Sequence, residues 1–258
     1  MRSALGWLRT GIWPLVQWLA IFVARRIGGR RDAIGLSHTA WQEMGRKRWD
    51  LAIYYARGAV AADPSYAHGY RMLGLAYLRA GAARARESFQ DGTRAVPDAA
   101  LLWAALGDLE RESRRHDEAE AAYREALRLE PTNIQALLGL GWTLQSRGRP
   151  REAEPVLDRA YGLGSDNIHV LRALAVARIA QGKFRNAVPL LTEVVKREPA
   201  GALGHGLLSI ALRGIGNIDG AVEEAHRAAD LEPENQSYQQ RYRAMLRAAS
   251  SRPNEGED

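Results

Sequence analysis

Residues 103–131 read WAALGDLERESRRHDEAEAAYREALRLEP, and this stretch decides the fold. Two runs with helical spacing, each rich in Ala or Leu, flank a polar segment around His116. Ala is the strongest helix former and lets two helices approach closely. Pro131 ends the second run, because proline supplies no backbone donor inside a helix. The stretch therefore predicts two antiparallel helices of about 14 residues joined by a short turn.

The same punctuation recurs along the chain at Pro64, Pro97, Pro131, Pro199 and Pro233. The intervals are 33, 34, 68 and 34 residues, and Ser165 bisects the long one. A small residue stands twelve positions before each mark, at Ala52, Ala85, Ala119, Ala153, Ala187 and Ala221. A single unit of this size cannot bury its apolar face, so neighbouring units are expected to stack and share one core.

This pattern resembles the tetratricopeptide repeat family. The residues that carry the family's W-x2-L-G…A-x3-F…P pattern are Trp103, Leu106, Gly107, Ala119, Tyr123, Ala126 and Pro131, with Glu110 where a Tyr is usual. The resemblance covers residues 33–233 and implies an all-α, right-handed superhelical solenoid of about six helix pairs. The implied units are 33–65, 66–98, 99–132, 133–166, 167–200 and 201–233. Residues 234–249 are expected to form a capping helix, and 250–258 a flexible tail.

In this family the first helix of each unit lines a groove that takes peptides or partner helices. The resemblance places the following residues in that groove: Trp41, Met44, His68, Arg71, Leu75, Arg79, Asp108, Arg111, Gln135, Leu138, Trp142, Gln145, His169, Arg172, Val176, Ile179, Ile210 and Arg213. One subset of the family holds peptide carboxylates with Lys and Asn in the groove. Here Asp108, Trp142 and Val176 stand at the Asn positions, so that co-chaperone role is not expected.

Each prominent groove residue also has a plain structural interpretation. Trp142 either anchors a partner or packs inside the core, because a phase error of one residue would turn it inward. Arg71, Arg111 and Arg172 either pair with acidic groups of a partner or are paired and solvated within the solenoid. Trp103 and Tyr123 are expected to be core residues.

The N-terminal segment is of a different kind from the repeats. Residues 5–24 read LGWLRTGIWPLVQWLAIFVA, and about 20 helical residues span a bilayer core. The segment predicts a membrane-anchor helix within residues 1–31, built on Trp7, Trp13, Trp18, Leu19 and Phe22 and followed by Arg25 and Arg26. Three alternatives stay open: a helix lying flat on the membrane, a cleaved signal peptide, and a helix packed on the solenoid. The flanking Arg residues favour a bacterial inner membrane with the repeats in the cytoplasm, and the periplasm stays possible.

The charge distribution argues against nucleic-acid binding. Residues 1–31 hold six of the 36 Lys and Arg residues and none of the 30 Asp and Glu residues, so the rest of the chain is formally neutral. A nucleic-acid binder usually carries a basic stripe on its folded body. No cysteine is present, the six His are scattered, and no Gly-rich phosphate loop occurs. The sequence therefore predicts no enzyme, no metal and no cofactor.

The sequence favours a membrane-tethered scaffold or assembly factor that binds proteins through a peptide or helix. Two alternatives remain. The chain is a non-catalytic subunit of a larger membrane complex, with its Trp-rich N-terminal helix among partner helices, or it is a soluble solenoid that self-assembles into a homo-oligomer.

Overall fold

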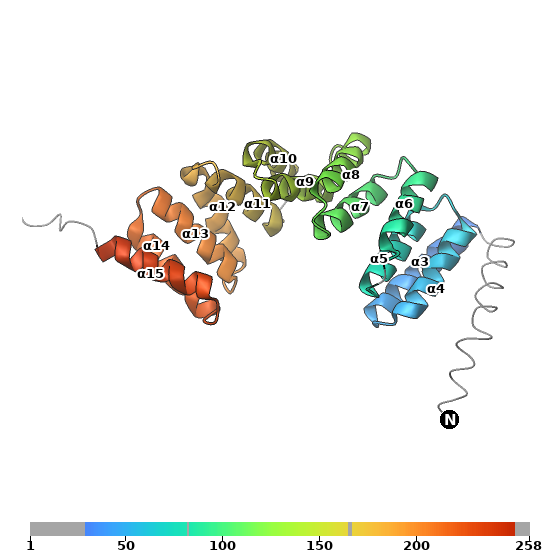
Figure 1. The fold of residues 1–258 in the computed structure, drawn as a ribbon, viewed down its shortest axis with the longest axis horizontal. Coiled ribbons are helices and arrows are strands. Elements are labelled where there is room, and N and C mark those ends of the chain that lie inside the picture. Colours follow the sequence, from blue (N-terminus) through green and yellow to red (C-terminus); the bar gives the residue numbers. More distant parts are fainter. Residues whose placement is uncertain (1–28, 82, 165–166, 251–258) are drawn as a thin grey trace, which may run out of the picture. The chain divides into compact units, whose positions relative to one another are not determined.

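The computed structural model describes residues 29–81, 83–164 and 167–250, and within them all regular structure is helical (Figure 1). The predicted all-α class is therefore confirmed. The helices are α3 (Arg30–Gly45), α4 (Trp49–Ala62), α5 (Ala67–Arg79), α6 (Ala85–Ala95), α7 (Ala100–Glu112), α8 (His116–Leu129), α9 (Ile134–Ser146), α10 (Pro150–Gly162), α11 (Ile168–Ile179), α12 (Phe184–Arg197), α13 (Ala202–Gly214), α14 (Ile218–Leu231) and α15 (Gln236–Ser250).

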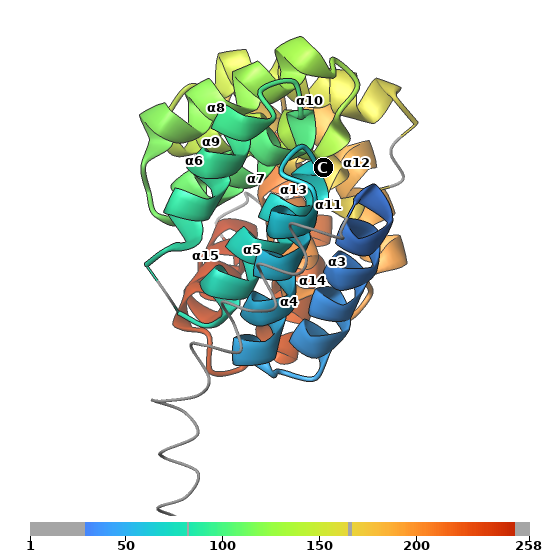
Figure 2. The ribbon, with the colours of Figure 1, turned by 90° about the vertical axis from the view of Figure 1, so that its right-hand side faces the viewer.

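The contacts divide the chain into two units, Met1–Ala136 and Leu137–Asp258, and the division falls within α9. In the first unit α3 packs on α4, α5 on α6 and α7 on α8. The first helices of these pairs also contact one another, α3 against α5 and α5 against α7. Figure 2 shows α3, α4 and α5 lying side by side. The helix pair is thus the repeating element, and the first helices of successive pairs lie along one side of the unit.

The second unit repeats this arrangement. Here α11 packs on α12, α13 on α14, and α11 also contacts α13. Helix α15 packs on α14 and buries Tyr238 among Ala202, Ala228 and Ala229. Farther along the helix, Met245 lies against Ala221 and Ala225. Helix α15 therefore covers apolar surface that the last pair would otherwise expose.

Close helix approach explains the small residues of the repeat. Ala52, Ala119 and Ala187, which stand at one repeat phase, have no exposed surface. Gly107 faces the Tyr123 ring so closely that a Cβ on the glycine would lie 2.7 Å from Tyr123 Cε1. An alanine there would push the ring aside, so the glycine sets the distance between α7 and α8.

Two interior prolines do not interrupt their helices. Pro155 lies within α10 and Pro189 within α12, and these helices begin earlier, at Pro150 and Phe184. From the sequence, either a slight bend at Pro155 and Pro189 or a helix that starts late, after the proline, is expected, and the late start is wrong.

The predicted anchor residues Trp7, Trp13, Trp18, Leu19, Phe22, Arg25 and Arg26 lie outside the described residues. Ser165, which stands at a repeat boundary, lies outside them as well, and so do residues 251–258 of the expected C-terminal tail. Among the helices that are described, none combines the length and the apolar character needed to cross a membrane.

Candidate partner-binding surface

The first helices of the first unit present apolar and cationic side chains together. Trp41 on α3 is 60% exposed, and Ile34 on the same helix is 50% exposed. Of the predicted groove residues on α5, His68 and Arg79 are exposed, and Arg71 and Leu75 are half-buried. Met44 is buried and belongs to the core around Ala40 and Ala56, so the structure does not bring it to this surface.

Asp108 on α7 is held by neighbours within the chain. The Tyr123 hydroxyl donates to Asp108 Oδ1 at 2.6 Å, and Gln135 Nε2 donates to Oδ2 at 2.5 Å. Arg111 Nε donates to the Tyr123 oxygen at 3.4 Å. Burial, and then the Asp108 carboxylate, raise the pKa of the Tyr123 hydroxyl, so it stays a donor. The predicted groove residues Asp108, Arg111 and Gln135 therefore form one network around a buried core tyrosine.

In the second unit an aromatic and basic cluster lies on α9 and α11. Trp142 is half-buried, and its ring meets the His169 ring edge-on, with 6.3 Å between the centroids. Arg172 Nη2 lies 2.8 Å from His169 Nδ1 and donates to it, since a guanidinium has no acceptor. Arg172 Nη1 also lies 3.7 Å from Glu198 Oε2. The structure thus brings Trp142, His169 and Arg172 together.

The remaining predicted residues of the second unit are placed differently. Gln145 Nε2 donates to the Ala173 carbonyl at 2.8 Å, which joins α9 to α11. Val176, Ile179 and Ile210 are half-buried, and Arg213 is exposed. Leu138 is 7% exposed and therefore contributes little to any open surface.

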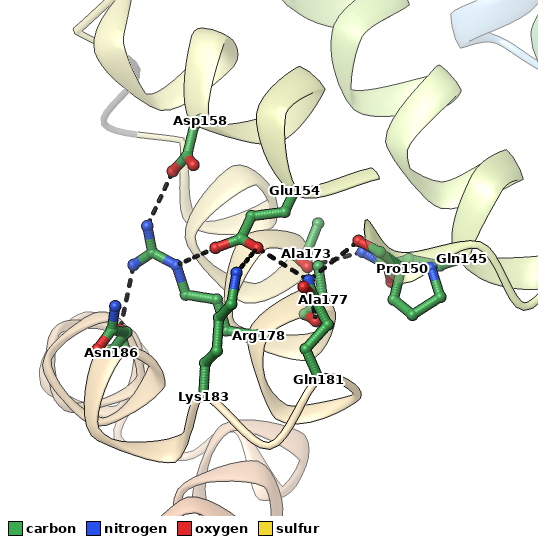
Figure 3. A network of polar contacts seen from close by, with 10 residues as sticks. All are labelled: Gln145, Pro150, Glu154, Asp158, Ala173, Ala177, Arg178, Gln181, Lys183 and Asn186. Atoms are coloured by element: carbon green, nitrogen blue, oxygen red, sulfur yellow. Dashed lines mark hydrogen bonds and ion pairs between the residues drawn. The ribbon is translucent and has the colours of Figure 1, made fainter. Parts of the chain in front are cut away.

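A polar network that the sequence did not indicate joins α10, α11 and the start of α12 (Figure 3). Arg178 contacts Asp158 at 2.9 Å and Glu154 at 3.4 Å, and Gln181 Nε2 donates to Glu154 Oε2 at 2.9 Å. Lys183 Nζ lies 2.5 Å from the same oxygen. Burial alone would raise the pKa of Glu154, but the hydrogen bonds from Lys183 and Gln181, together with the positive charges of Lys183 and Arg178, hold that pKa below its usual value.

The network has a counterpart in the first unit with the charges exchanged. Arg86 Nη2 donates to Glu110 Oε2 at 2.6 Å, and these residues stand 68 positions before Glu154 and Arg178. Both pairs join the second helix of one pair to the first helix of the next. Sequence reasoning missed them because the intermediate repeat carries Glu120 and Leu144 at these two phases, and these residues cannot form an ion pair.

No group of three or more His, Cys, Asp or Glu side chains that could hold a metal ion occurs in residues 29–81, 83–164 and 167–250. The arrangement of the first helices offers exposed aromatic and aliphatic side chains beside fixed polar groups. Such a surface suits recognition of another chain.

Two family models, both described as tetratricopeptide repeat, match this chain. One covers residues 110–177, and the other covers residues 82–134 and 172–236. Together they run over 82–236, which is more than half of the chain. No curated protein matches it.

Solved structures similar to this chain have helical repeats as well. PilF of Pseudomonas aeruginosa has a TM-score of 0.72 at 17% identity, over 81% of this chain and 96% of PilF. PilW, described as a widely conserved type IV pilus biogenesis factor, has a TM-score of 0.67 at 20% identity, over 83% of this chain and 98% of PilW. YrrB, a TPR protein with an unusual peptide-binding site, has a TM-score of 0.62 at 19% identity, over 76% of this chain and 97% of YrrB. At these identities the likeness shows the fold.

Proposed function

Because the chain belongs to the tetratricopeptide repeat family, we propose that it is a non-catalytic scaffold that captures a peptide or a helix of another protein. The binding surface is the side that the first helices of neighbouring pairs share. The observation that carries the proposal is the placement of the two tryptophans, Trp41 and Trp142, on first helices with part of their surface exposed.

Large aromatic side chains on such a surface are the usual anchors of protein interfaces, because they bury much area at little entropic cost. Around Trp142, His169 and Arg172 are already held by hydrogen bonds. A surface held in place before binding loses less conformational entropy when the partner docks.

The proposal includes a membrane tether in residues 1–31. The support comes from the sequence, in which Arg residues flank a 20-residue stretch of mainly apolar residues, and residues 1–31 contain no Asp or Glu. A tether at a bacterial inner membrane raises the local concentration of the scaffold for partners in the same membrane.

Co-purification of the full chain in mild detergent, followed by mass spectrometry, tests the capture. We expect a partner that Trp142→Ala or Trp41→Ala loses and that Tyr161→Ala retains. Tyr161 is the matched control, because it is an aromatic residue, 47% exposed, that lies on a second helix. Retention of every partner by both tryptophan variants would contradict the proposal.

Carbonate washing of membranes tests the tether. The full chain should stay with the membrane pellet, and a variant that lacks residues 1–31 should be released. If the shortened chain stays in the pellet, the tether lies elsewhere.

A further inference from the structure

Three arginines on first helices are candidates for pairing with a partner, and the structure separates them. Arg111 donates to Tyr123, and Arg172 contacts His169 and Glu198. Arg71 has no hydrogen bond or ion pair to any residue of the described part of the chain, and its Nε is buried without an acceptor. A half-buried guanidinium with an orphaned N–H costs stability unless an acceptor reaches it.

A second orphaned donor occupies the equivalent position on the neighbouring helix. Ser37 on α3 stands 34 residues before Arg71, and α3 packs on α5. The Ser37 side chain is nearly fully buried, and its hydroxyl has no partner among the described residues. Two packed helices thus carry unpaired donors at one repeat phase.

Of the two arginines in this region, Arg30 is paired with Asp63 and Arg71 has no acid paired with it among the described residues. Burial first, and then the positive charges of Arg71 and Arg30, lower the pKa of the neighbouring His68, so two guanidinium groups act on this region. Arg30 stacks on the Tyr66 ring at 4.8 Å, and Tyr66 in turn stacks on His68. The nearby acid, Asp63, already binds Arg30 and Ser65. The local field therefore attracts an anion.

An acidic group that pairs with Arg71 does not come from the N-terminal segment, residues 1–31. Residues 1–31 contain no Asp or Glu, so the N-terminal segment has no carboxylate to offer. A carboxylate matches the planar fork of a guanidinium and accepts two parallel hydrogen bonds from it. Leu75 lies one turn beyond Arg71 on α5, and Trp41 holds the equivalent position on α3. A ligand held at Arg71 thus lies beside apolar side chains.

We infer that Arg71, with His68 beside it, binds an Asp or Glu side chain of an acidic segment in the partner protein, and that an apolar residue of this segment packs on Trp41 and Leu75. The inference rests on the proposed function and names the partner's chemistry at one end of the same surface.

Selection of binders from a random peptide library displayed on phage, with the full chain in detergent as bait, tests this. The selected peptides should be enriched in Asp and Glu next to an apolar residue. Arg71→Gln should weaken the best peptide roughly tenfold or more, and replacing the peptide's acid by its amide should have the same effect. The two changes together should cost little more than either one. Arg84→Gln, which removes an exposed charge of the same unit, should change the affinity less than twofold.

The other outcomes each decide against part of the account. If no peptide is selected, the proposed capture of peptides fails. If peptides bind equally well to Arg71→Gln, the surface captures peptides but the carboxylate site is wrong. If Arg71→Gln weakens only the binding to phosphatidylglycerol vesicles, the cations serve a lipid. If deletion of 251–258, with its Glu255, Glu257 and Asp258, raises peptide affinity, the chain's own acidic stretch is the occupant and not a partner. Circular dichroism of Arg71→Gln checks that the fold is kept.

Discussion

The proline carbonyl at the end of a repeat accepts a hydrogen bond from a different kind of side chain in three of the repeats. Trp103 Nε1 donates to the Pro97 carbonyl at 2.8 Å, and His205 Nε2 donates to the Pro199 carbonyl at 3.0 Å. Gln239 Nε2 reaches the Pro233 carbonyl at 3.4 Å. The donor stands six residues after the proline in each case. The proline closes the preceding helix pair, so its carbonyl has no helical partner and a side chain satisfies it.

His205 is expected to contribute most to stability among these donors. It is 4% exposed, and its other ring nitrogen lies 2.5 Å from Glu224 Oε2. His205→Ala leaves both acceptors short of a donor and opens a void, so it should lower the free energy of unfolding by about 2–3 kcal/mol. Urea unfolding of the full chain measures this. His226→Ala, at an exposed histidine paired with Asp230, should cost less than about 0.5 kcal/mol. Equal losses in the two variants would contradict the assignment.

Glu154 predicts a dependence of stability on pH. Burial raises the pKa of Glu154 in the folded chain, but the hydrogen bonds from Lys183 and Gln181 and the charges of Lys183 and Arg178 together lower it further than burial raises it. A carboxyl with a lowered folded pKa stabilises the fold above its unfolded pKa of 4.5, and the contribution is lost as the pH falls through the folded pKa. The difference in unfolding free energy between the wild type and Glu154→Gln should therefore be largest near pH 7 and shrink below pH 4.5. Thermal melts across this range measure it, and a constant difference would contradict the mechanism.

The turns between the two helices of a pair share one backbone feature among the described residues. A residue with positive φ stands in this turn at Lys47, Gly81, Arg114, Gly148, Gly182 and Gly216. Side chains with a Cβ are strained in this left-handed region, and glycine is not. The turn therefore favours glycine, and two of the six positions carry another residue.

Exchanging residues in these turns should move stability in opposite directions. Arg114→Gly relieves the strain of φ 59° and should raise the free energy of unfolding by about 1 kcal/mol. Gly148→Ala introduces such strain at φ 70° and should lower it by about 1 kcal/mol. Chemical denaturation measures both. A loss of stability in Arg114→Gly would show that its side chain, and not its backbone, determines the turn.

The exchanged ion pairs predict a rescue. Arg86→Glu places two carboxylates together in a site where the Glu110 side chain is 5% exposed, and should lower the free energy of unfolding by roughly 3 kcal/mol. Adding Glu110→Arg recreates the order seen in Glu154 and Arg178 and should restore most of that loss. Denaturation of the single and double variants measures the coupling. A double variant no more stable than Arg86→Glu would contradict an equivalent role for the two sites.

The periodic part of the sequence predicted the helices well, because small residues and prolines recur wherever two helices touch or end. Residues that depart from the repeat were less accessible. Glu154 and Arg178 are 24 residues apart in sequence, and the equivalent residues are Glu120 and Leu144 one repeat earlier and Arg86 and Glu110 two repeats earlier. Averaging over repeats therefore hides the ion pair. The repeat phase predicted a position in the groove for Trp41, Met44 and Leu138 alike, but Met44 and Leu138 are buried and only Trp41 is exposed. Burial depends on how far each helix rotates against its neighbours, and a shared period does not specify that rotation.

Taken over its whole length, the chain carries its net charge outside the repeats. The basic excess lies in residues 1–31, and the remainder is formally neutral with 30 charges of each sign. Many of the described charges pair within the repeats, as Arg86 does with Glu110 and Arg178 with Asp158 and Glu154. Arg86 also has a buried Nε without an acceptor, but its Nη2 binds Glu110, whereas Arg71 has no hydrogen bond or ion pair to any described residue. This contrast supports a surface specialised at one place on a scaffold whose other charges serve the fold.

Photo-crosslinking in cells tests the central claim most directly. A benzophenone amino acid replaces Leu75 or Val176 on first helices, or the exposed Arg124 or Arg185 on second helices, in the full chain. The account predicts that Leu75 and Val176 form an adduct with the same partner protein, and that Arg124 and Arg185 form none. Adducts with that partner from Arg124 and Arg185 alone would place recognition on the second helices and contradict the account.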